Sequence, residues 1–337
     1  MSRPPALRRL ASQQGFALLA VLLVLAFVGI IGAEFAYSMR LEASAARTYK
    51  ETLIASHLAE AGLEQAIREL VGDFAFVGFH EESKLGGKKS DDDKAKEGDV
   101  NPDCPLVFYT RERLLLKRLP NRNVPLGGGH FSYCISDEAA RLNLNTSPPD
   151  RLGRLLQVLG LEREARDGVV DSIQDWRDPN EDHRLNGAES DDTYLKRPVP
   201  YRSKNANFDS LSELLQVKGI TSKLMDGEDG RPGLASLVTV KGNGQININT
   251  VGKEVVRALG LSDAEFSELE QARRQGPYTT VPARFSGRGM TVTSRIFRIE
   301  ALGLIEGQVR AKITAIVEKR SDSGGEGVAV LEWSGVH

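Results

Sequence analysis

The chain has few of the residues that build catalytic and metal centres. Its two cysteines, Cys104 and Cys134, are too few for a disulfide scaffold or a four-cysteine zinc site. Its five histidines are isolated, without HExxH or catalytic-triad spacing, and no glycine-rich loop carries the lysine that a phosphate cradle needs. We therefore expect that this protein is not an enzyme.

An excess of charge of either sign is also missing. The 44 basic and 46 acidic residues give a formal net charge of −2, which argues against a general nucleic-acid binder. Hydrophobic residues make up 40% of the 337 residues, an ordinary globular balance. This length predicts two folded units plus additional segments.

One long apolar run lies near the N-terminus. Residues 16–33 carry no charge and, as a helix, would span roughly 27 Å, close to the hydrocarbon thickness of a bilayer. Arg3, Arg8 and Arg9 precede the run, which predicts a cytoplasmic leader over residues 1–15 and the bulk of the chain on the other side. A buried core helix and a cleaved signal peptide are the alternatives to this transmembrane helix, which we assign to residues 16–37.

The helix is expected to continue beyond the membrane over residues 38–70. No proline occurs between residues 6 and 101. An apolar stripe with helical periodicity is formed by Ile54, Leu58, Ala61, Leu63, Ile67 and Leu70. The next part, residues 71–141, contains a polar segment over 81–99 that predicts a mobile loop.

Strand patterns bracket a helical middle segment, and together they predict an α+β fold. The expected strands are His130–Ser136, a hairpin of Arg295–Ala301 and Val309–Val317 that turns at Gly307, and Val328–Trp333. We assign the C-terminal strands to residues 286–337 and an inserted helical domain to residues 142–285.

The helical middle segment is internally repeated. The motifs LNLNT (residues 142–146) and ININT (residues 246–250) are each followed by a helix, a Leu-Gly-Leu turn and a second helix. These copies resemble helix-hairpin-helix or SAM-like units, many of which bind DNA through Gly-x-Gly turns. The turns here have a single glycine, yet a membrane-anchored helix-hairpin-helix DNA-binding protein of the competence type remains the alternative function.

The junction before the apolar run resembles a prepilin processing site. Gln13-Gln14-Gly15 is followed at once by Phe16, as in type IV prepilins and type II secretion pseudopilins. The resemblance implies that a prepilin peptidase cuts after Gly15 and methylates Phe16. Those families have a glutamate at the fifth mature position, which pairs with the amine of the preceding subunit. Here that position is Ala20, as expected for a first subunit that has no predecessor.

Together with the run Asp175-Trp176-Arg177-Asp178 and the two repeats, these features resemble the minor pseudopilin K (GspK) family of type II secretion. The resemblance implies a pilin-like fold, a long N-terminal helix on an antiparallel sheet, with a large inserted helical domain. It implies a single-pass inner-membrane protein with a periplasmic head at the tip of the pseudopilus, where it primes assembly of the filament for export of folded proteins. The implied partners are pseudopilins I and J, with H and the major pseudopilin G as further candidates, and no nucleic acid.

Residues 171–192 hold eight acidic residues, whose mutual repulsion requires solvation or a counter-ion. Calcium accepts six to eight oxygen ligands in a loose geometry, and the resemblance supports bound calcium in this segment. The ligands we expect are Asp175, Asp178, Asn180, Asp182, Glu189, Asp191 and Asp192. A solvated acidic loop is the alternative.

The two cysteines have two possible states. A periplasmic location permits a disulfide between Cys104 and Cys134, which would close a loop of about 30 residues and contribute ~3–4 kcal/mol if unstrained. Two buried free thiols are the alternative.

Processing is testable at Gly15. Replacing Gly15 with a bulky residue such as leucine is expected to leave an uncut precursor that retains Arg8 and Arg9, whereas Gly15→Ala should have the mildest effect. N-terminal sequencing and intact mass measure the outcome. A mature chain that begins near Ala33 would instead show an ordinary signal peptide.

Overall fold

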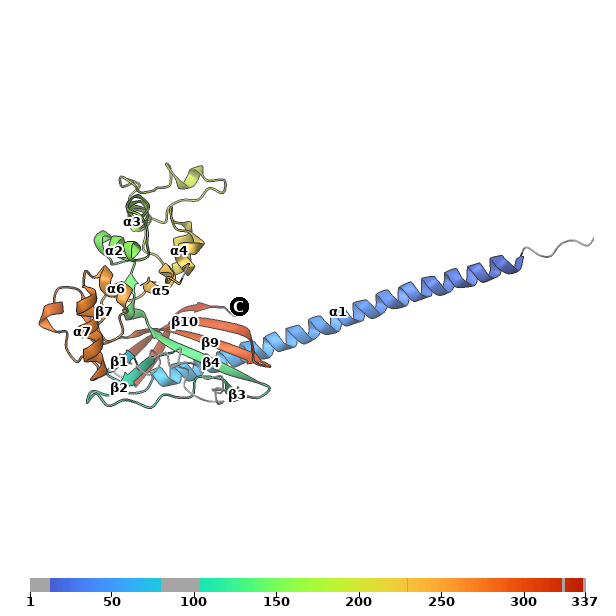
Figure 1. The fold of residues 1–337 in the computed structure, drawn as a ribbon, viewed down its shortest axis with the longest axis horizontal. Helices are drawn as coiled ribbons and strands as arrows, with labels where there is room; N and C mark the ends of the chain where they lie inside the picture. Colours follow the sequence, from blue (N-terminus) through green and yellow to red (C-terminus); the bar gives the residue numbers. More distant parts are fainter. Residues whose placement is uncertain (1–12, 80–103, 229, 323–324, 336–337) are drawn as a thin grey trace, which may run out of the picture. The chain divides into compact units, whose positions relative to one another are not determined.

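The computed structural model describes residues 13–79, 104–228, 230–322 and 325–335 (Figure 1). The chain forms two compact units, Met1–Ile54 and Ala55–His337. Helix α1 (Gln13–Leu70) contributes to both units, so the continuous N-terminal helix that we predicted is confirmed over this range. Most of the predicted leader and the predicted loop over residues 81–99 lie outside the described residues.

The first unit contains the apolar part of α1. Among the described residues, α1 is the one helix that is long and apolar enough to cross a membrane. Its apolar side chains are exposed within this chain, for example Phe16 at 77% and Ile31 at 55%. Exposing so much apolar surface to water is unfavourable, so lipid or other apolar helices must surround this stretch, as in a membrane anchor.

The second unit is built on an antiparallel sheet of five strands in the order β11-β10-β9-β4-β3 (Figure 1). The strands are β3 (Val124–Leu126), β4 (Gly129–Asp137), β9 (Ile296–Ile305), β10 (Gln308–Asp322) and β11 (Gly325–Ser334). The predicted strand segments coincide with β4, β9, β10 and β11, except that Arg295 precedes β9. A two-stranded ribbon, β1 (Phe76–Phe79) with β2 (Leu106–Tyr109), was not predicted.

The β9–β10 hairpin follows from its sequence pattern. Alternate residues of β9 are buried from Phe297 to Ala301, and the residues between them are partly exposed. The turn residues Glu306 and Gly307 have φ angles of 52° and 75°. A two-residue turn with positive φ at both positions matches the twist of the flanking strands, so the predicted turn at Gly307 is confirmed.

The C-terminal part of α1 packs closely on this sheet. Its buried positions are Ala55, Leu58, Ala59, Leu63, Ala66 and Leu70. The predicted stripe identified the three leucines correctly. Its other members, Ile54, Ala61 and Ile67, are half-buried. It left out the three buried alanines. Small side chains are needed because helix and sheet nearly touch: a Cβ atom on Gly62 would lie 3.2 Å from the ring of Phe131.

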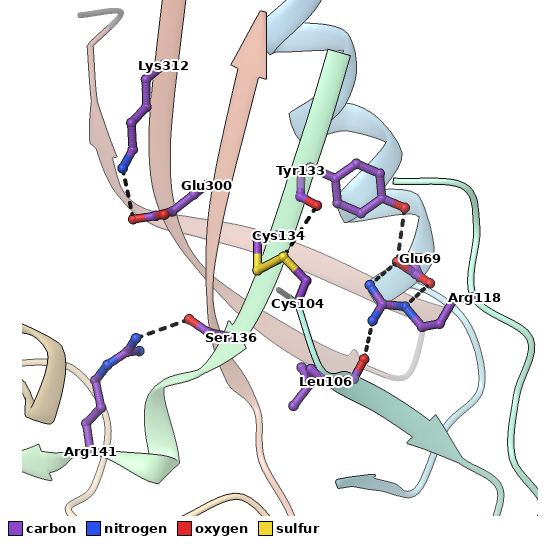
Figure 2. The surroundings of a disulfide bond; sticks show 10 residues. All are labelled: Glu69, Cys104, Leu106, Arg118, Tyr133, Cys134, Ser136, Arg141, Glu300 and Lys312. Carbon is purple, nitrogen blue, oxygen red and sulfur yellow. Dashed lines mark hydrogen bonds and ion pairs between the residues drawn. A yellow bond between two sulfur atoms is a disulfide. The ribbon is translucent and has the colours of Figure 1, made fainter. Parts of the chain in front are cut away.

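The segment that begins at Cys104 is fastened to the sheet and to α1 at two points (Figure 2). Cys104 forms a disulfide with Cys134 of β4, with the two Cα atoms 5.4 Å apart. Arg118 donates two hydrogen bonds to the Glu69 carboxylate of α1, at 2.5 and 3.0 Å, and both side chains are almost fully buried. Burial and the nearby charge of Glu69 raise the pKa of the Tyr133 hydroxyl, which donates to the same carboxylate at 3.1 Å.

The helical block is inserted between the adjacent strands β4 and β9 (Figure 1), as predicted. Its helices are α2 (Pro149–Val158), α3 (Arg163–Arg177), α4 (Ser222–Asp226), α5 (Leu234–Leu237), α6 (Lys253–Ala258) and α7 (Asp263–Arg274). The 3₁₀ turns are η2 (Glu138–Ala140), η3 (Tyr194–Lys196), η4 (Leu211–Gln216) and η5 (Ala283–Phe285). Two short parallel ribbons join β5 (Leu142–Asn143) to β6 (Val238–Thr239) and β7 (Ile246–Asn247) to β8 (Met290–Thr291).

The two N-x-N-T motifs make the same hydrogen bonds. The amide of Asn145 donates to two backbone carbonyls, one of them that of Phe208 at 3.0 Å, and its oxygen accepts from the Phe208 N–H at 2.8 Å. In the second copy, Asn249 does the same with Tyr278, at 3.0 and 2.7 Å. The internal repeat is therefore confirmed, while the helix-hairpin-helix class of the two copies stays a prediction.

Arginines at the ends of α3 and α7 close the two copies in the same way. Arg177 donates to the carbonyls of Leu144 and Ser147, and Arg273 donates to the carbonyl of Ile248 and to one further carbonyl. Burial lowers the pKa of Arg273 to about 10. The repeat thus extends from the motif to an arginine in the last turn of each second helix.

Two adjacent buried acids join the sheet to both copies. Asp137, the last residue of β4, accepts from the Ala139 N–H at 2.8 Å and from three side chains of the second copy: Asn247, Thr250 and Ser294. Glu138 accepts from Thr239 of the first copy and pairs with Arg141 and Arg298. Burial raises the pKa of the Asp137 carboxyl, and its four hydrogen bonds oppose that rise.

The contact between α1 and the sheet predicts a large cost for a methyl group at Gly303. A Cβ atom there would lie 1.9 Å from the Ala55 carbonyl oxygen, so Gly303→Ala must displace the helix. We expect a loss of about 1–3 kcal/mol in the free energy of unfolding, measured by denaturant titration. Gly327→Ala in β11 is the control, because its Cβ would meet nothing within 4 Å. Equal stability of the two variants would contradict this packing.

Candidate functional site

The acidic segment is an insertion into the first copy of the repeat. Thirty residues separate Arg177 from Phe208, whereas four separate the equivalent Arg273 from Tyr278. The second copy forms the same hydrogen bonds without the additional residues. The insertion is therefore not needed for the scaffold of the repeat, and all but one of the predicted calcium ligands lie in it or at its start.

Asp175, the remaining predicted ligand, holds the insertion in place. Its side chain is fully buried and accepts from the backbone N–H groups of Arg184, at 3.1 Å, and Ala188, at 2.9 Å. A Cβ atom on Gly187 would lie 1.8 Å from the Asp175 Oδ2 atom, so the loop can approach only with glycine there. The first role of Asp175 is therefore to position the loop over residues 184–188.

Asp178 shares a guanidinium with Asp175. The Arg184 Nη1 atom lies 2.6 Å from Asp178 Oδ2 and 2.6 Å from Asp175 Oδ1. The other oxygen of Asp178, Oδ1, is buried and has no hydrogen-bond partner. One side of this carboxylate is thus neutralised and the other is left without a donor.

Glu189 has a similar half-satisfied carboxylate in a more buried position. Its side chain is 2% exposed, and its Oε2 atom accepts from the Ser203 hydroxyl at 2.5 Å. Its Oε1 atom is buried without a partner. Burial raises the pKa of Glu189, and the charges of Asp175 and Glu181 add to that rise.

A third unpartnered oxygen comes from a residue that the sequence did not indicate. The Oδ1 atom of Asn205 is buried without a partner, while its Nδ2 atom donates to Glu181 Oε1 at 3.1 Å. Asn205 has a φ of 50°, an uncommon backbone conformation for a residue other than glycine. Glu181 and Asn205 were missed because they are 24 residues apart and no local spacing links them.

The remaining predicted ligands are not brought to these buried oxygens. Asn180, Asp182, Asp191 and Asp192 are exposed. Asn180 accepts from the Asp182 N–H at 2.8 Å, and Asp192 accepts from the Glu189 N–H at 2.9 Å. Within the described part of the chain, no three His, Cys, Asp or Glu side chains are gathered closely enough to hold a metal ion.

Three buried oxygens of the insertion have no hydrogen-bond donor, one each on Asp178, Glu189 and Asn205. A buried oxygen without a donor is costly, and carboxylate and amide oxygens are the ligands that calcium prefers. The chemistry of these oxygens suits calcium, while the described structure does not gather three acidic side chains around one point.

The glycine turns that suggested DNA binding are covered by arginines of the same chain. A Cβ atom on Gly160 would lie 2.1 Å from the Arg231 guanidinium, and Arg231 donates to the Leu159 carbonyl at 3.5 Å. At the second turn, Arg154 donates to the Ala258 carbonyl at 2.8 Å. The first turn is therefore not open to a phosphate, and the described structure lends the DNA-binding alternative no support.

The processing site lies at the beginning of the described chain. Gly15 is within α1, and Phe16 follows it with a largely exposed side chain. Ala20, four residues further along, is also exposed.

Comparisons with known proteins find relatives in one family. A protein of Pectobacterium carotovorum subsp. carotovorum, the type II secretion system protein K, is 34% identical over 120 residues, which are 31% of this chain and 36% of that relative. The protein of the same name from Pseudomonas aeruginosa is 26% identical over 258 residues, 73% of this chain and 68% of that relative. A family model described as type II secretion system (T2SS), protein K, matches residues 136–227.

All of these matches are to the type II secretion protein K family, which this chain resembles. The match to the family model begins at the end of β4 and covers the first copy with its acidic insertion. The fold agrees with this resemblance. A crystal structure of the GspK-GspI-GspJ complex from enterotoxigenic Escherichia coli has a similar chain, with a TM-score of 0.56 and 19% identity over 87% of this chain and 98% of that one.

Proposed function

We propose that the protein is a minor pseudopilin that caps the tip of a type II secretion pseudopilus. The observation that carries the proposal is the helical block inserted between β4 and β9 of a sheet covered by α1, in a chain that resembles the protein K family. Such a block adds bulk beside the helix that a filament subunit uses for packing. It acts by assembly rather than by catalysis.

The apolar half of α1 supports a membrane anchor with the leader in the cytoplasm and the second unit in the periplasm. The arginines before the apolar run favour that orientation, and the Cys104–Cys134 disulfide suits an oxidising compartment. Ala20 supports the first position in the filament, because a subunit without a predecessor has no amine for a carboxylate to neutralise. A charge there would be unpaired among apolar helices.

Pseudopilins I and J are the proposed partners, since the crystal structure with the similar fold is a complex of those three proteins. The surface proposed for them is α1 beyond the membrane, where large apolar side chains are exposed: Met39, Leu41, Tyr49 and Leu53. Exposed apolar side chains in a row along one helix mark an interaction surface.

Co-purification tests both the partners and this surface. The full-length protein, expressed with pseudopilins I and J and extracted in detergent, should retain both on an affinity resin. Leu41→Asp should reduce their recovery at least tenfold, because an unpaired carboxylate would be buried at the contact. Val199→Asp, at a side chain 78% exposed in the helical block, is the matched control. Failure of the wild-type protein to retain I and J would contradict the proposal.

We also propose that calcium binds the acidic insertion through the unpartnered oxygens of Asp178, Glu189 and Asn205. An ion that binds only the folded state stabilises it by mass action, by about 2.7 kcal/mol at a hundredfold excess over the dissociation constant. Calcium should therefore raise the Tm of the full-length protein by a few degrees, and chelator should reverse the rise.

Differential scanning calorimetry measures this effect. Glu189→Gln should abolish the response, and Glu164→Gln, at an exposed carboxylate of α3, should keep it. Identical melting curves with calcium and with chelator, together with no calcium by elemental analysis, would rule the site out.

A further inference from the structure

The face of the sheet that carries α1 extends onto the edge strand β11. Gly303 of β9 lies on this face, since a Cβ atom there would be 1.9 Å from the Ala55 carbonyl oxygen of α1. Alternate residues of a strand share a face, and so do directly opposed residues of an antiparallel pair. Ile299 of β9 pairs with Ala315 of β10, which in turn pairs with Trp333 of β11. The side chain of Trp333 therefore projects on the same side of the sheet as α1.

A β-bulge brings Val330 onto the same face as Trp333. Val330 pairs with Val317 of β10, whereas Glu332 pairs with the residue before Val317, so Leu331 is the additional residue of β11. Residues three apart in a regular strand project from opposite faces, and a bulge changes this alternation. One inserted residue thus places two large apolar side chains next to each other on the face that carries α1.

These two side chains are half exposed, although the residues paired with them in β10 are fully buried. Val330 is 48% exposed and Trp333 is 49% exposed, whereas Trp176, the other tryptophan of the chain, is 2% exposed. Apolar surface in water is unfavourable, and tryptophan is a frequent anchor of protein interfaces. Together with Val328, which is partly buried on the same face, these residues form an apolar surface that we call the edge shelf.

The spacing of the strands leaves room for one more helix on this face. A Cβ atom on Gly62 of α1 would lie 3.2 Å from Phe131 of β4 and 3.5 Å from Ala301 of β9, so α1 runs over those two strands. Neighbouring strands are about 4.8 Å apart, which places β11 roughly 10 Å beyond β9. The axes of packed helices are about 8–10 Å apart. A second helix alongside α1 would therefore lie over β10 and β11 and cover the edge shelf.

We infer that the edge shelf is the docking surface for an amphipathic helix of a neighbouring pseudopilin, I or J, which packs alongside α1. This inference rests on the proposed function and names one contact of that assembly. A helix fits because this apolar sheet face is already closed by a helix over β4 and β9. A strand added to the edge would pair with the backbone of β11 and leave the shelf uncovered. The opposite face of β11 is engaged within the chain, since Glu332 forms an ion pair with Lys241 of the helical block.

Co-purification of the full-length protein with pseudopilins I and J in detergent tests this surface. Trp333→Ala should reduce the recovery of at least one of them about tenfold or more, as expected for an anchoring tryptophan. Leu331→Ala is the matched control and should retain both. Leu331 is an apolar residue of the same strand, but it lines the cleft between the sheet and the helical block.

Val330→Asp is the second variant, and it decides the question if Trp333→Ala does not fold. A charge on an exposed edge strand is tolerated in the free protein, but under an apolar helix it would be buried without a partner. Recovery of both partners at the wild-type level by the folded variants would overturn the edge shelf and leave the proposed function standing. Failure of the wild type to retain either partner would overturn both.

Photo-crosslinking identifies the occupant directly. With p-benzoylphenylalanine in place of Trp333, irradiation of the complex should join this chain to a helix of I or J, and mass spectrometry of the crosslinked peptides locates the contact. A crosslink to a strand of the partner, to a second copy of this chain or to another segment of the same chain would contradict the inference.

Discussion

Two adjacent buried carboxylates at the end of β4 connect the antiparallel sheet to both copies of the repeat. Asp137 is bound by the second copy of the repeat and Glu138 by the first, and Asp137 ends β4, an interior strand of the antiparallel sheet. A buried carboxylate without partners would be strongly unfavourable. Each copy can satisfy one of them only in one position, so the pair fixes how the helical block meets the sheet.

This junction explains how a pilin-like sheet accommodates an insertion of this size. The chain leaves the sheet at Asp137 and returns at Ile296, and the two strands concerned are hydrogen-bonded neighbours, with Asp137 opposite Phe297. The insertion therefore leaves and rejoins the sheet at the same end of two adjacent strands. The sheet, the close contact with α1 and the Glu69–Arg118 pair are built entirely from residues outside it.

The sequence was sufficient for the architecture and insufficient for the contacts within the acidic insertion. Periodicity identified α1 and the principal strands, and the N-x-N-T motifs identified the repeat, because these signals are local. The alanines of α1 were missed because their burial depends on Gly303, far along the chain. Likewise, acid density indicated the insertion, but it could not distinguish Asp175, which accepts backbone hydrogen bonds, from Glu189, or connect Asn205 to Glu181.

The second copy of the repeat acts as an internal reference for the first. It has the same asparagine, arginine and glycine-turn geometry with four residues where the first copy has thirty. The hydrogen bonds that define the repeat therefore do not depend on the insertion. Evolution could change the chemistry of that insertion, or delete it, while the part of the molecule that enters the filament kept its shape.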